Sequence, residues 1–380
     1  MFEDSGALWP IIDILLKAIG WIAWLIALVW AVAGITFFPK LNAKLGFGLA
    51  VVALTAFLMT ALHYQDRHVL IYGVWGFDLL VLLALFCIHP RADRNWAEDM
   101  QYSVQVDFVK GVATLHNVRD FFYQSETEFT PSWVTRRIPL TGLHKVWLGV
   151  EQISAWEGVA HIFITFEYQD ESGESDAIAV SAEVHREVGE EFSVQEGLFR
   201  NFELAYVVGT ERDLIGLRTH VRNDPVRLYP LKIGREAVQR MFEDVMQRAM
   251  DLQEKPEFYH TISNNCASNM LYHLNKLAPT PISKWDKRII FSGLVDRIVF
   301  ALKIVPGVNS LKELRQQYLV DISRFDMDEN YSKCLRSVGL NQDSDSKKAS
   351  SKSDSKSKSD SKSKSDNKSS SSKSAGKSSS

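Results

Sequence analysis

Three apolar stretches follow one another near the N-terminus, at residues 18–38, 45–62 and 69–88. A helix that crosses a bilayer needs about 20 predominantly apolar residues, and each stretch approaches that length. No small-residue cleavage site follows the first stretch, as a cleaved signal peptide would require. The pattern therefore predicts a permanent anchor of three transmembrane helices over residues 1–90.

After the third stretch the pattern becomes that of a soluble α+β domain, which we expect to cover residues 91–340. Alternating or continuous runs of β-branched and aromatic residues predict strands at 104–109, 112–118, 145–153, 159–167 and 177–185. Apolar residues at helical spacing predict helices at 235–254, bounded by Pro256, and at 310–319.

Residues 341–380 consist almost entirely of Ser, Lys and Asp, a composition that cannot bury apolar surface and predicts a disordered tail. The formal net charge of the chain is −3. From Asp343 onward the tail has ten Lys and five Asp, which leaves −8 for the rest. A folded part of this charge is not expected to bind nucleic acid.

One polar turn ends in a cysteine that opens an apolar, helix-like run. Ser263, Asn264 and Asn265 are residue types that cap helices, so we expect Cys266 in the first turn of a helix. Unpaired N–H groups and the positive end of the helix dipole stabilise a thiolate there and can hold an oxyanion. A lone cysteine in this position is more often structural, so a catalytic interpretation requires a partner.

His161 is a candidate partner, because it lies in the predicted strand 159–167. The following strand places Ser181 and Glu183 on one face, where either side chain could orient a histidine that acts as general base. For Glu183, a salt bridge with Arg186, Arg212 or Arg218 is the alternative role. A disulfide between Cys266 and Cys334 would block this chemistry, so the catalytic interpretation needs Cys266 reduced.

Metal and cofactor motifs are not evident. His260, Cys266 and His273 are close in sequence, but no Cys-x-x-Cys or His-Glu-x-x-His pattern accompanies them, and no glycine-rich phosphate loop occurs. We therefore expect neither a metal nor a cofactor.

Several motifs, in this order, together suggest a family. They are Asp93–Trp96, Asn117–Phe121, Thr130–Trp133, Trp156, Ala160-His161, Ser181-Ala-Glu183, Glu211–Asp213, Arg218 and Tyr259 through Asn264-Asn265-Cys266. From about Arg91 to Arg336 the chain resembles the N-terminal periplasmic domain of the Lnb-type lipoprotein N-acyltransferases. His185, His260 and Ala267 depart from the pattern of that family.

The resemblance implies a circularly permuted papain-like fold, akin to the NlpC/P60 group, with an antiparallel sheet and with the histidine strand before the cysteine helix. It implies Cys266 as nucleophile and His161 as its base. We further expect Glu183 or Ser181 as the third catalytic member and Asn264 and Asn265 as oxyanion or positioning residues. Trp156, Tyr259 and Arg218 are the expected substrate-binding residues.

These expectations together predict a membrane-anchored thiol acyltransferase with membrane lipids as partners and a lipoprotein as candidate substrate. The alternatives are a cysteine peptidase or amidase that acts on cell-wall peptide, and a non-catalytic membrane protein. The basic residues Lys40, Lys44, Arg91 and Arg94 favour a cytoplasmic domain by the positive-inside rule. The resemblance instead implies a bacterial inner-membrane protein whose soluble domain is periplasmic.

Overall fold

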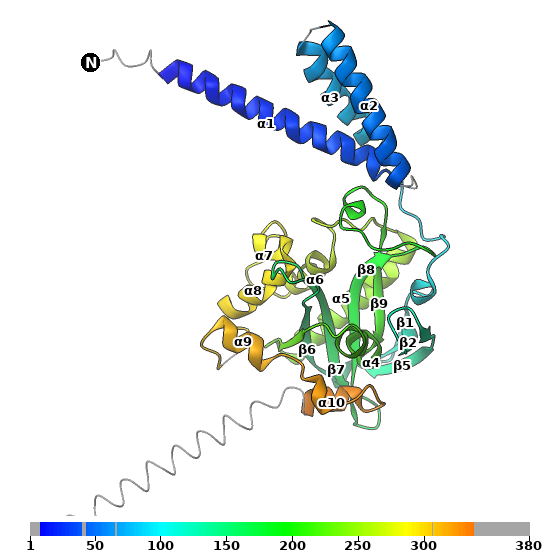
Figure 1. The fold of residues 1–380 in the computed structure, drawn as a ribbon. Coiled ribbons are helices and arrows are strands. Elements are labelled where there is room, and N and C mark those ends of the chain that lie inside the picture. The colour runs from blue at the N-terminus through cyan, green and yellow to red at the C-terminus, as the bar shows by residue number, and fades with distance from the viewer. Residues whose placement is uncertain (1–7, 40–42, 65–66, 306, 338–380) are drawn as a thin grey trace, which may run out of the picture.

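The computed structural model describes residues 8–39, 43–64, 67–305 and 307–337, and the predicted disordered tail lies outside these residues. Three N-terminal helices stand apart from an α+β domain built around one sheet (Figure 1). The helices are α1 (Leu8–Thr36), α2 (Ala43–Tyr64) and α3 (Arg67–Phe86).

The surface of α1 is apolar, with large side chains such as Ile14, Ile26 and Val29 more than 60% exposed. Such a surface requires an apolar environment. The stretch Pro10–Thr36 is long and apolar enough to cross a membrane. In the described residues of α2 and α3 the apolar runs are shorter, Leu45–Met59 and Ile71–Phe86, so of the three predicted spans only the first is clear. The predicted second and third spans, 45–62 and 69–88, also include residues 60–62, 69 and 70, which lie outside the residues whose side chains the structure describes.

The soluble domain is built on an eight-stranded sheet. Its strands are β1 (Gln105–Val109), β2 (Val112–Arg119), β5 (Trp133–Pro139), β6 (Leu143–Glu151), β7 (His161–Gln169), β8 (Ser175–His185), β9 (Glu203–Thr210) and β10 (Val226–Pro230). The order is β1-β2-β9-β8-β7-β6-β10, with β5 paired to β2. Two short strands, β3 (Phe122–Tyr123) and β4 (Phe129–Thr130), pair with each other beside it.

The sheet is mixed, whereas an antiparallel sheet was predicted. All pairs are antiparallel except β2 and β9, which run parallel and meet at Arg119 and Gly209. This contact joins the β1-β2-β5 unit to the central strands. The expectation fails here because the sequence shows hairpins, which are antiparallel, but not how separate hairpins join.

Helices cover both faces of the sheet. The first face packs on α5 (Arg235–Glu254), α6 (Cys266–Asn275), α7 (Lys287–Ile290) and α8 (Val295–Ala301). The second is covered by α4 (Glu211–Gly216), the π-helical turn η4 (Leu217–Val221) and α10 (Tyr331–Ser337). Helix α9 (Leu311–Gln317) packs beside α8, and short 3-10 turns lie at η1 (Glu98–Met100), η2 (Leu140–Gly142), η3 (Glu196–Leu198), η5 (Ser292–Leu294) and η6 (Ile322–Arg324).

Side chains alternate between these faces as predicted for β8. Ile178, Val180, Ala182 and Val184 enter the core on the α5–α6 face. Ala179 lies in the cluster on the opposite face, so Ser181 and Glu183 project there too. The sheet therefore has an apolar face under α6 and a face with polar side chains under α4 and η4.

Candidate active site

Cys266 is the first residue of α6, as the sequence predicted. Asn265 caps the helix, because its side chain accepts a hydrogen bond from the N–H of Ser268, and the Ser268 hydroxyl accepts one from the N–H of Asn265. This reciprocal pair is a capping box. Asn265 takes the N–H of Ser268, so the N–H groups of Cys266 and Ala267 are those of the first turn left near the Cys266 sulfur.

The side chains of Asn264 and Asn265 hold the loop before Cys266 in shape. The Asn264 amide donates to the carbonyl of Phe258, 2.9 Å away, and its oxygen accepts from Asn269. The Asn265 amide donates to the carbonyl of Thr261 at 2.6 Å. Both side chains are thus positioned as supports of the cysteine loop. An oxyanion at Cys266 would meet backbone N–H groups in preference to these amides.

His161 is the first residue of β7 and lies at the rim of the sheet. Cys266 comes from the core on the other face, and its side chain lies close enough to the imidazole to raise the pKa of His161. Its Nε2 lies 2.5 Å from the Ser181 hydroxyl and 3.1 Å from Oε1 of Glu183. Since Nε2 faces the strand β8 partners, Nδ1 is the nitrogen left to face the sulfur. The structure therefore brings together the four residues expected as catalytic.

A network of buried charged side chains contacts this histidine through Glu183. Ser181 donates to Glu183 at 2.7 Å, and Arg218 donates to the same carboxylate oxygen at 2.7 Å. Arg218 also donates to Glu151 at 2.8 Å. Glu151 is 1% exposed and pairs with His161 across the β6–β7 ladder. Arg218 thus holds two buried carboxylates beside the imidazole, so its described contacts are those of a positioning residue.

The charges around His161 favour the protonated form of its imidazole. Burial alone would lower the pKa of His161, but the charges of Glu183 and Cys266 outweigh it and raise that pKa from 6.5 to about 10. Burial likewise opposes ionisation of Glu183, yet His161 and Arg218 hold the pKa of Glu183 well below its usual value. The imidazole is therefore protonated at neutral pH, which favours a thiolate–imidazolium pair.

Comparison with known families agrees with the motifs. Residues 129–293 match the family described as the Lnb N-terminal periplasmic domain. Over this segment the chain is similar to the Lnb N-terminal periplasmic domain, the family that the motifs suggested. The match runs from β4 into η5 and contains Cys266, His161 and Glu183, but it is shorter than the range over which the motifs suggested resemblance. No significant match was found among curated proteins or solved structures.

The family and the apolar helix α1 together indicate a membrane-anchored protein with a periplasmic Lnb domain. All three cysteines are free, including Cys87, which is exposed. Cys334 packs in the cluster under the second face of the sheet, away from the core that contains Cys266. The Cys266 thiol is therefore unblocked, as the catalytic interpretation requires.

The three predicted substrate-binding residues of the Lnb domain have different surroundings. Tyr259 precedes the cysteine loop, and burial followed by the charges of Cys266 and Glu183 raises the pKa of Tyr259 well above its usual value. Its neutral hydroxyl therefore lies near the reacting pair. Arg218 is 3% exposed within the ion network.

Trp156 lies on the loop before β7, 55% exposed, and its ring packs edge-on against Phe291 with centroids 5.3 Å apart. That loop rests on η5, where a Cβ on Gly293 would lie only 1.9 Å from the carbonyl oxygen of Glu157, so only glycine permits this packing. Trp156 lines neither of the two cavities beside the pair.

A polar cavity of about 420 Å³ adjoins the Lnb site on one side. His161, Glu183, Arg218 and Tyr259 line it, together with charged residues from elsewhere in the domain. The additional charged lining residues are Asp99, Arg119, Glu126, Glu151, Arg186, Glu191 and Arg222. Sequence reasoning missed Glu151 and Arg119, since nothing in a strand-end glutamate or arginine marks the side of the sheet it faces.

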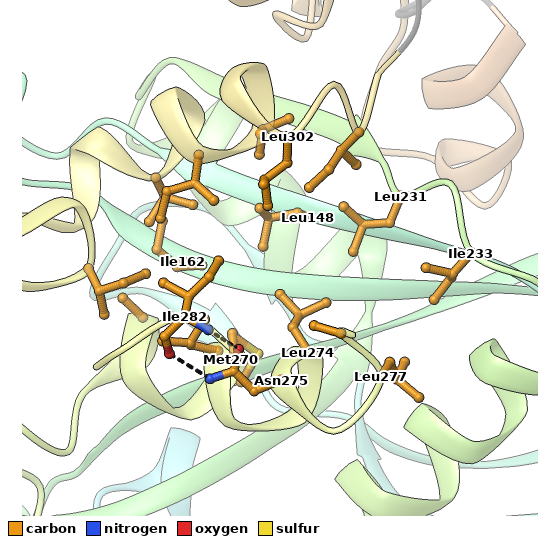
Figure 2. A pocket seen from close by; sticks show the side chains of 18 of the residues that line it. Leu148, Ile162, Leu231, Ile233, Met270, Leu274, Asn275, Leu277, Ile282 and Leu302 are labelled. Atoms are coloured by element: carbon orange, nitrogen blue, oxygen red, sulfur yellow. Dashed lines mark hydrogen bonds between the residues drawn. The ribbon is translucent and has the colours of Figure 1, made fainter. Parts of the chain in front are cut away.

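A second cavity, of about 410 Å³, lies on the other side of α6 and is lined mainly by aliphatic side chains (Figure 2). Ile162 and Ala267, which directly follow His161 and Cys266 in the chain, are part of its wall. The candidate dyad therefore stands between a charged cavity and an apolar one.

The Lnb site is connected to the N-terminal helices by a short loop. Phe199 is 3% exposed and packs against Trp30 and Phe37 of the α1 end and against α3. The next residue, Arg200, donates to the carbonyl of Leu85 in the last turn of α3 and to that of Ile88 just after this helix. Basic groups at a helix C-terminus are favourable.

The same loop touches the cysteine loop. The carbonyl of Gly197 accepts the N–H of Thr261, and the carbonyl of Thr261 in turn accepts the Asn265 amide. A short series of contacts in space, from Phe199 through Gly197 and Thr261, therefore links the end of α1 to Asn265, the cap of the helix that begins with Cys266.

Proposed function

We propose that this protein is a membrane-anchored thiol acyltransferase that takes an acyl chain from a lipid or lipoprotein ester through a Cys266 thioester. The observation that carries the proposal is the imidazole of His161, which lies close to the Cys266 thiol on one side and contacts Ser181 and Glu183 on the other. This is the arrangement of an activated nucleophile, its base and an orienting group.

In the first half-reaction, the proton of Cys266 already resides on His161, and the sulfur attacks the ester carbonyl as a thiolate. The oxyanion faces the N–H groups at the start of α6. The carbon–oxygen bond then breaks, and the imidazolium returns its proton to the departing alkoxide. Glu183, held by Arg218, stabilises the imidazolium throughout.

In the second half-reaction, an amine attacks the thioester. Its nitrogen gives a proton to His161, the carbon–sulfur bond breaks, and the thiolate is restored. The α-amino group of a lipoprotein's terminal cysteine is the acceptor that we propose, on the basis of the family resemblance. With water as acceptor, the same chemistry is that of a lipase or thioesterase.

The membrane anchor supports a lipid substrate. In this proposal, α2 and α3 join α1 in a three-helix anchor that crosses the bacterial inner membrane, with the domain in the periplasm. The Phe199 loop then keeps the Cys266 loop near the lipid headgroups. A permuted papain-like arrangement is supported by the order of the strand with His161 before the helix with Cys266.

The polar cavity favours one alternative, a cysteine peptidase or amidase that acts on cell-wall peptide. Its charged lining suits a polar peptide better than an acyl chain. Both activities form a thioester at Cys266, but the acyl group comes from a peptide in one and from a lipid in the other.

The test is covalent trapping. The full chain in nanodiscs is incubated with a phospholipid that carries an alkyne-tagged acyl chain, and the tag is detected on the protein before and after hydroxylamine, which cleaves thioesters. We expect hydroxylamine-sensitive labelling of the wild type and of Cys334→Ser, but not of Cys266→Ser. Equal labelling of Cys266→Ser would refute the proposal. Labelling only by a tagged peptide would establish the peptidase.

A further inference from the structure

The aliphatic cavity beside α6 has the surroundings of a binding site for a hydrocarbon chain. Four groups of apolar residues enclose it. Helix α6 contributes Ala267, Met270, Leu271 and Leu274, and the sheet and the loop after it contribute Leu148, Ile162, Leu231 and Ile233. The region of α7 and α8 contributes Ile289, Val295, Ile298, Val299, Leu302 and Ile304. The loop after α6 contributes Leu277, Ala278, Pro279 and Ile282. No aromatic side chain is among them.

The interior offers almost nothing to a polar ligand. Asn275 is the only uncharged polar side chain in the described lining, and both ends of its amide are already occupied by Ile282, whose carbonyl accepts at 2.8 Å and whose N–H donates at 2.9 Å (Figure 2). A polar ligand would lose its hydrogen bonds to water on entering and gain none. Only a flexible apolar chain fits this lining without that loss.

The cavity follows the nucleophile helix away from the reacting atoms. Its wall begins at Ala267 and follows α6 to Asn275, a path of roughly 12 Å at 1.5 Å per residue, and then continues through the next loop to Ala278. The Asn275–Ile282 hydrogen bonds fold the following loop back over the far end. A chain attached to a carbonyl at Cys266 could therefore lie along α6 with its methyl end near Ala278.

Charge is confined to the rim. Lys232 and Lys303 are the only charged side chains in the described lining, and both are exposed. Leu302, between α8 and Lys303, is 59% exposed and continues the apolar surface outward. Cations beside an apolar opening complement an amphiphile with an anionic headgroup.

We propose that this cavity binds the acyl chain of the donor lipid and that its far end near Ala278 sets the longest chain accepted. This inference rests on the proposed function for the identity of the donor, but chain binding itself requires no chemistry at Cys266. Binding and turnover can therefore be tested separately.

The first experiment uses the full chain with Cys266→Ala, which cannot form a thioester. It is exposed in nanodiscs to a sixteen-carbon fatty acid with a diazirine near its methyl end, irradiated and mapped by mass spectrometry. We expect cross-links in peptides that contain Leu274, Ala278 or Leu302. Labelling restricted to α1–α3, as expected for lipid dissolved around the anchor, would overturn the proposal, and so would labelling of the polar cavity.

The second experiment shortens the cavity in the same Cys266→Ala background. Ala278→Trp fills the far end, whereas Thr280→Trp adds the same ring at an exposed position outside the lining. Ala278→Trp should lower labelling by the sixteen-carbon probe about tenfold, a change of about 1.4 kcal/mol, and spare an eight-carbon probe. Thr280→Trp should change neither. Equal labelling of both variants by both probes would refute the assigned chain path.

If these variants behave as expected while alkyne-lipid trapping at Cys266 fails, the cavity binds chains but the proposed transfer is wrong. If trapping succeeds and the cavity variants have no effect, transfer stands and the chain lies elsewhere.

Discussion

The two cavities beside Cys266 and His161 differ in how the fold stabilises them. The polar cavity is lined by charges that are paired and largely buried, such as Arg218 with Glu151 and Glu183. The apolar cavity is lined by side chains whose contribution comes from burial, with a single hydrogen-bonded amide at its end. They adjoin opposite sides of the same pair of residues.

This difference follows from the alternation of side chains along two strands. Ile162 faces α6 and lines the apolar cavity, whereas Ser181 and Glu183 face Arg218 of η4. His161, at the rim, has contacts to both sides. The β7–β8 hairpin therefore supplies both an apolar wall on one side of His161 and the charged residues that contact its imidazole on the other.

The largest effect is expected from removing the central cation of the polar side. Arg218→Met keeps the length of the side chain but leaves Glu151 with only the partly exposed Arg222 and Glu183 with only His161 as a cationic partner. Breaking a buried pair in this way costs about 3–5 kcal/mol of unfolding free energy. Chemical denaturation of the detergent-solubilised protein measures it.

Arg222→Met is the matched control, because Arg222 approaches the same Glu151 at 3.5 Å but its side chain is 36% exposed. Exposed pairs contribute about 0–1 kcal/mol. If the two variants lost equal stability, the buried network would not be the support that the contacts suggest.

Local signals made much of this site predictable from sequence. The capping residues before Cys266 placed it at a helix start, and alternation in β8 placed Ser181 and Glu183 on one face. Helix α5 was predicted with its observed bounds, Arg235–Glu254. These features depend on neighbouring residues, so the sequence displays them directly.

Features that depend on distant contacts were not predictable. Strand β9 was missed because it is buried on both faces, with seven of its eight residues buried, and so has no alternation. For Glu183 the sequence offered either His161 or an arginine as partner, and the structure gives it both. The role of Arg218 depends on the π-helical turn η4, whose position against Glu151 is set by the fold alone.

A smaller effect, on rate, is expected when the charge behind the imidazole is removed. Glu183→Gln should lower kcat/KM about 100-fold, within the range for general acid–base support. It should also move the alkaline limb of the pH profile. In the wild type this limb lies near the His161 pKa of about 10, since deprotonation there removes the acid and the partner of the thiolate.

Without the Glu183 charge the pKa of His161 falls, so the limb should move down by about one unit or more. The raised pKa also stabilises the wild-type fold fully below pH 6.5, and that contribution is lost as the pH rises through about 10. Glu236→Gln, at a carboxylate that is 93% exposed and outside both cavities, should leave the profile unchanged. A rate loss with no movement of the limb would mean that Glu183 does not act through His161.

The smallest effect is expected at the Phe199 loop, which contacts both the N-terminal helices and the loop before Cys266. Phe199→Ala removes the ring between Trp30 and Phe37 and loosens the loop whose Gly197 carbonyl holds Thr261. Small misplacements of a reacting group can cost up to about 100-fold in rate, so we expect about a tenfold loss on phospholipid in vesicles. A short soluble ester, which does not require the bilayer, should react at the wild-type rate. Val194→Ala, at a half-exposed side chain of the same segment, should affect neither substrate. Equal losses on the two substrates would show that Phe199 supports the fold of the site itself. Phe199 would then have no separate role in placing the two cavities at the bilayer.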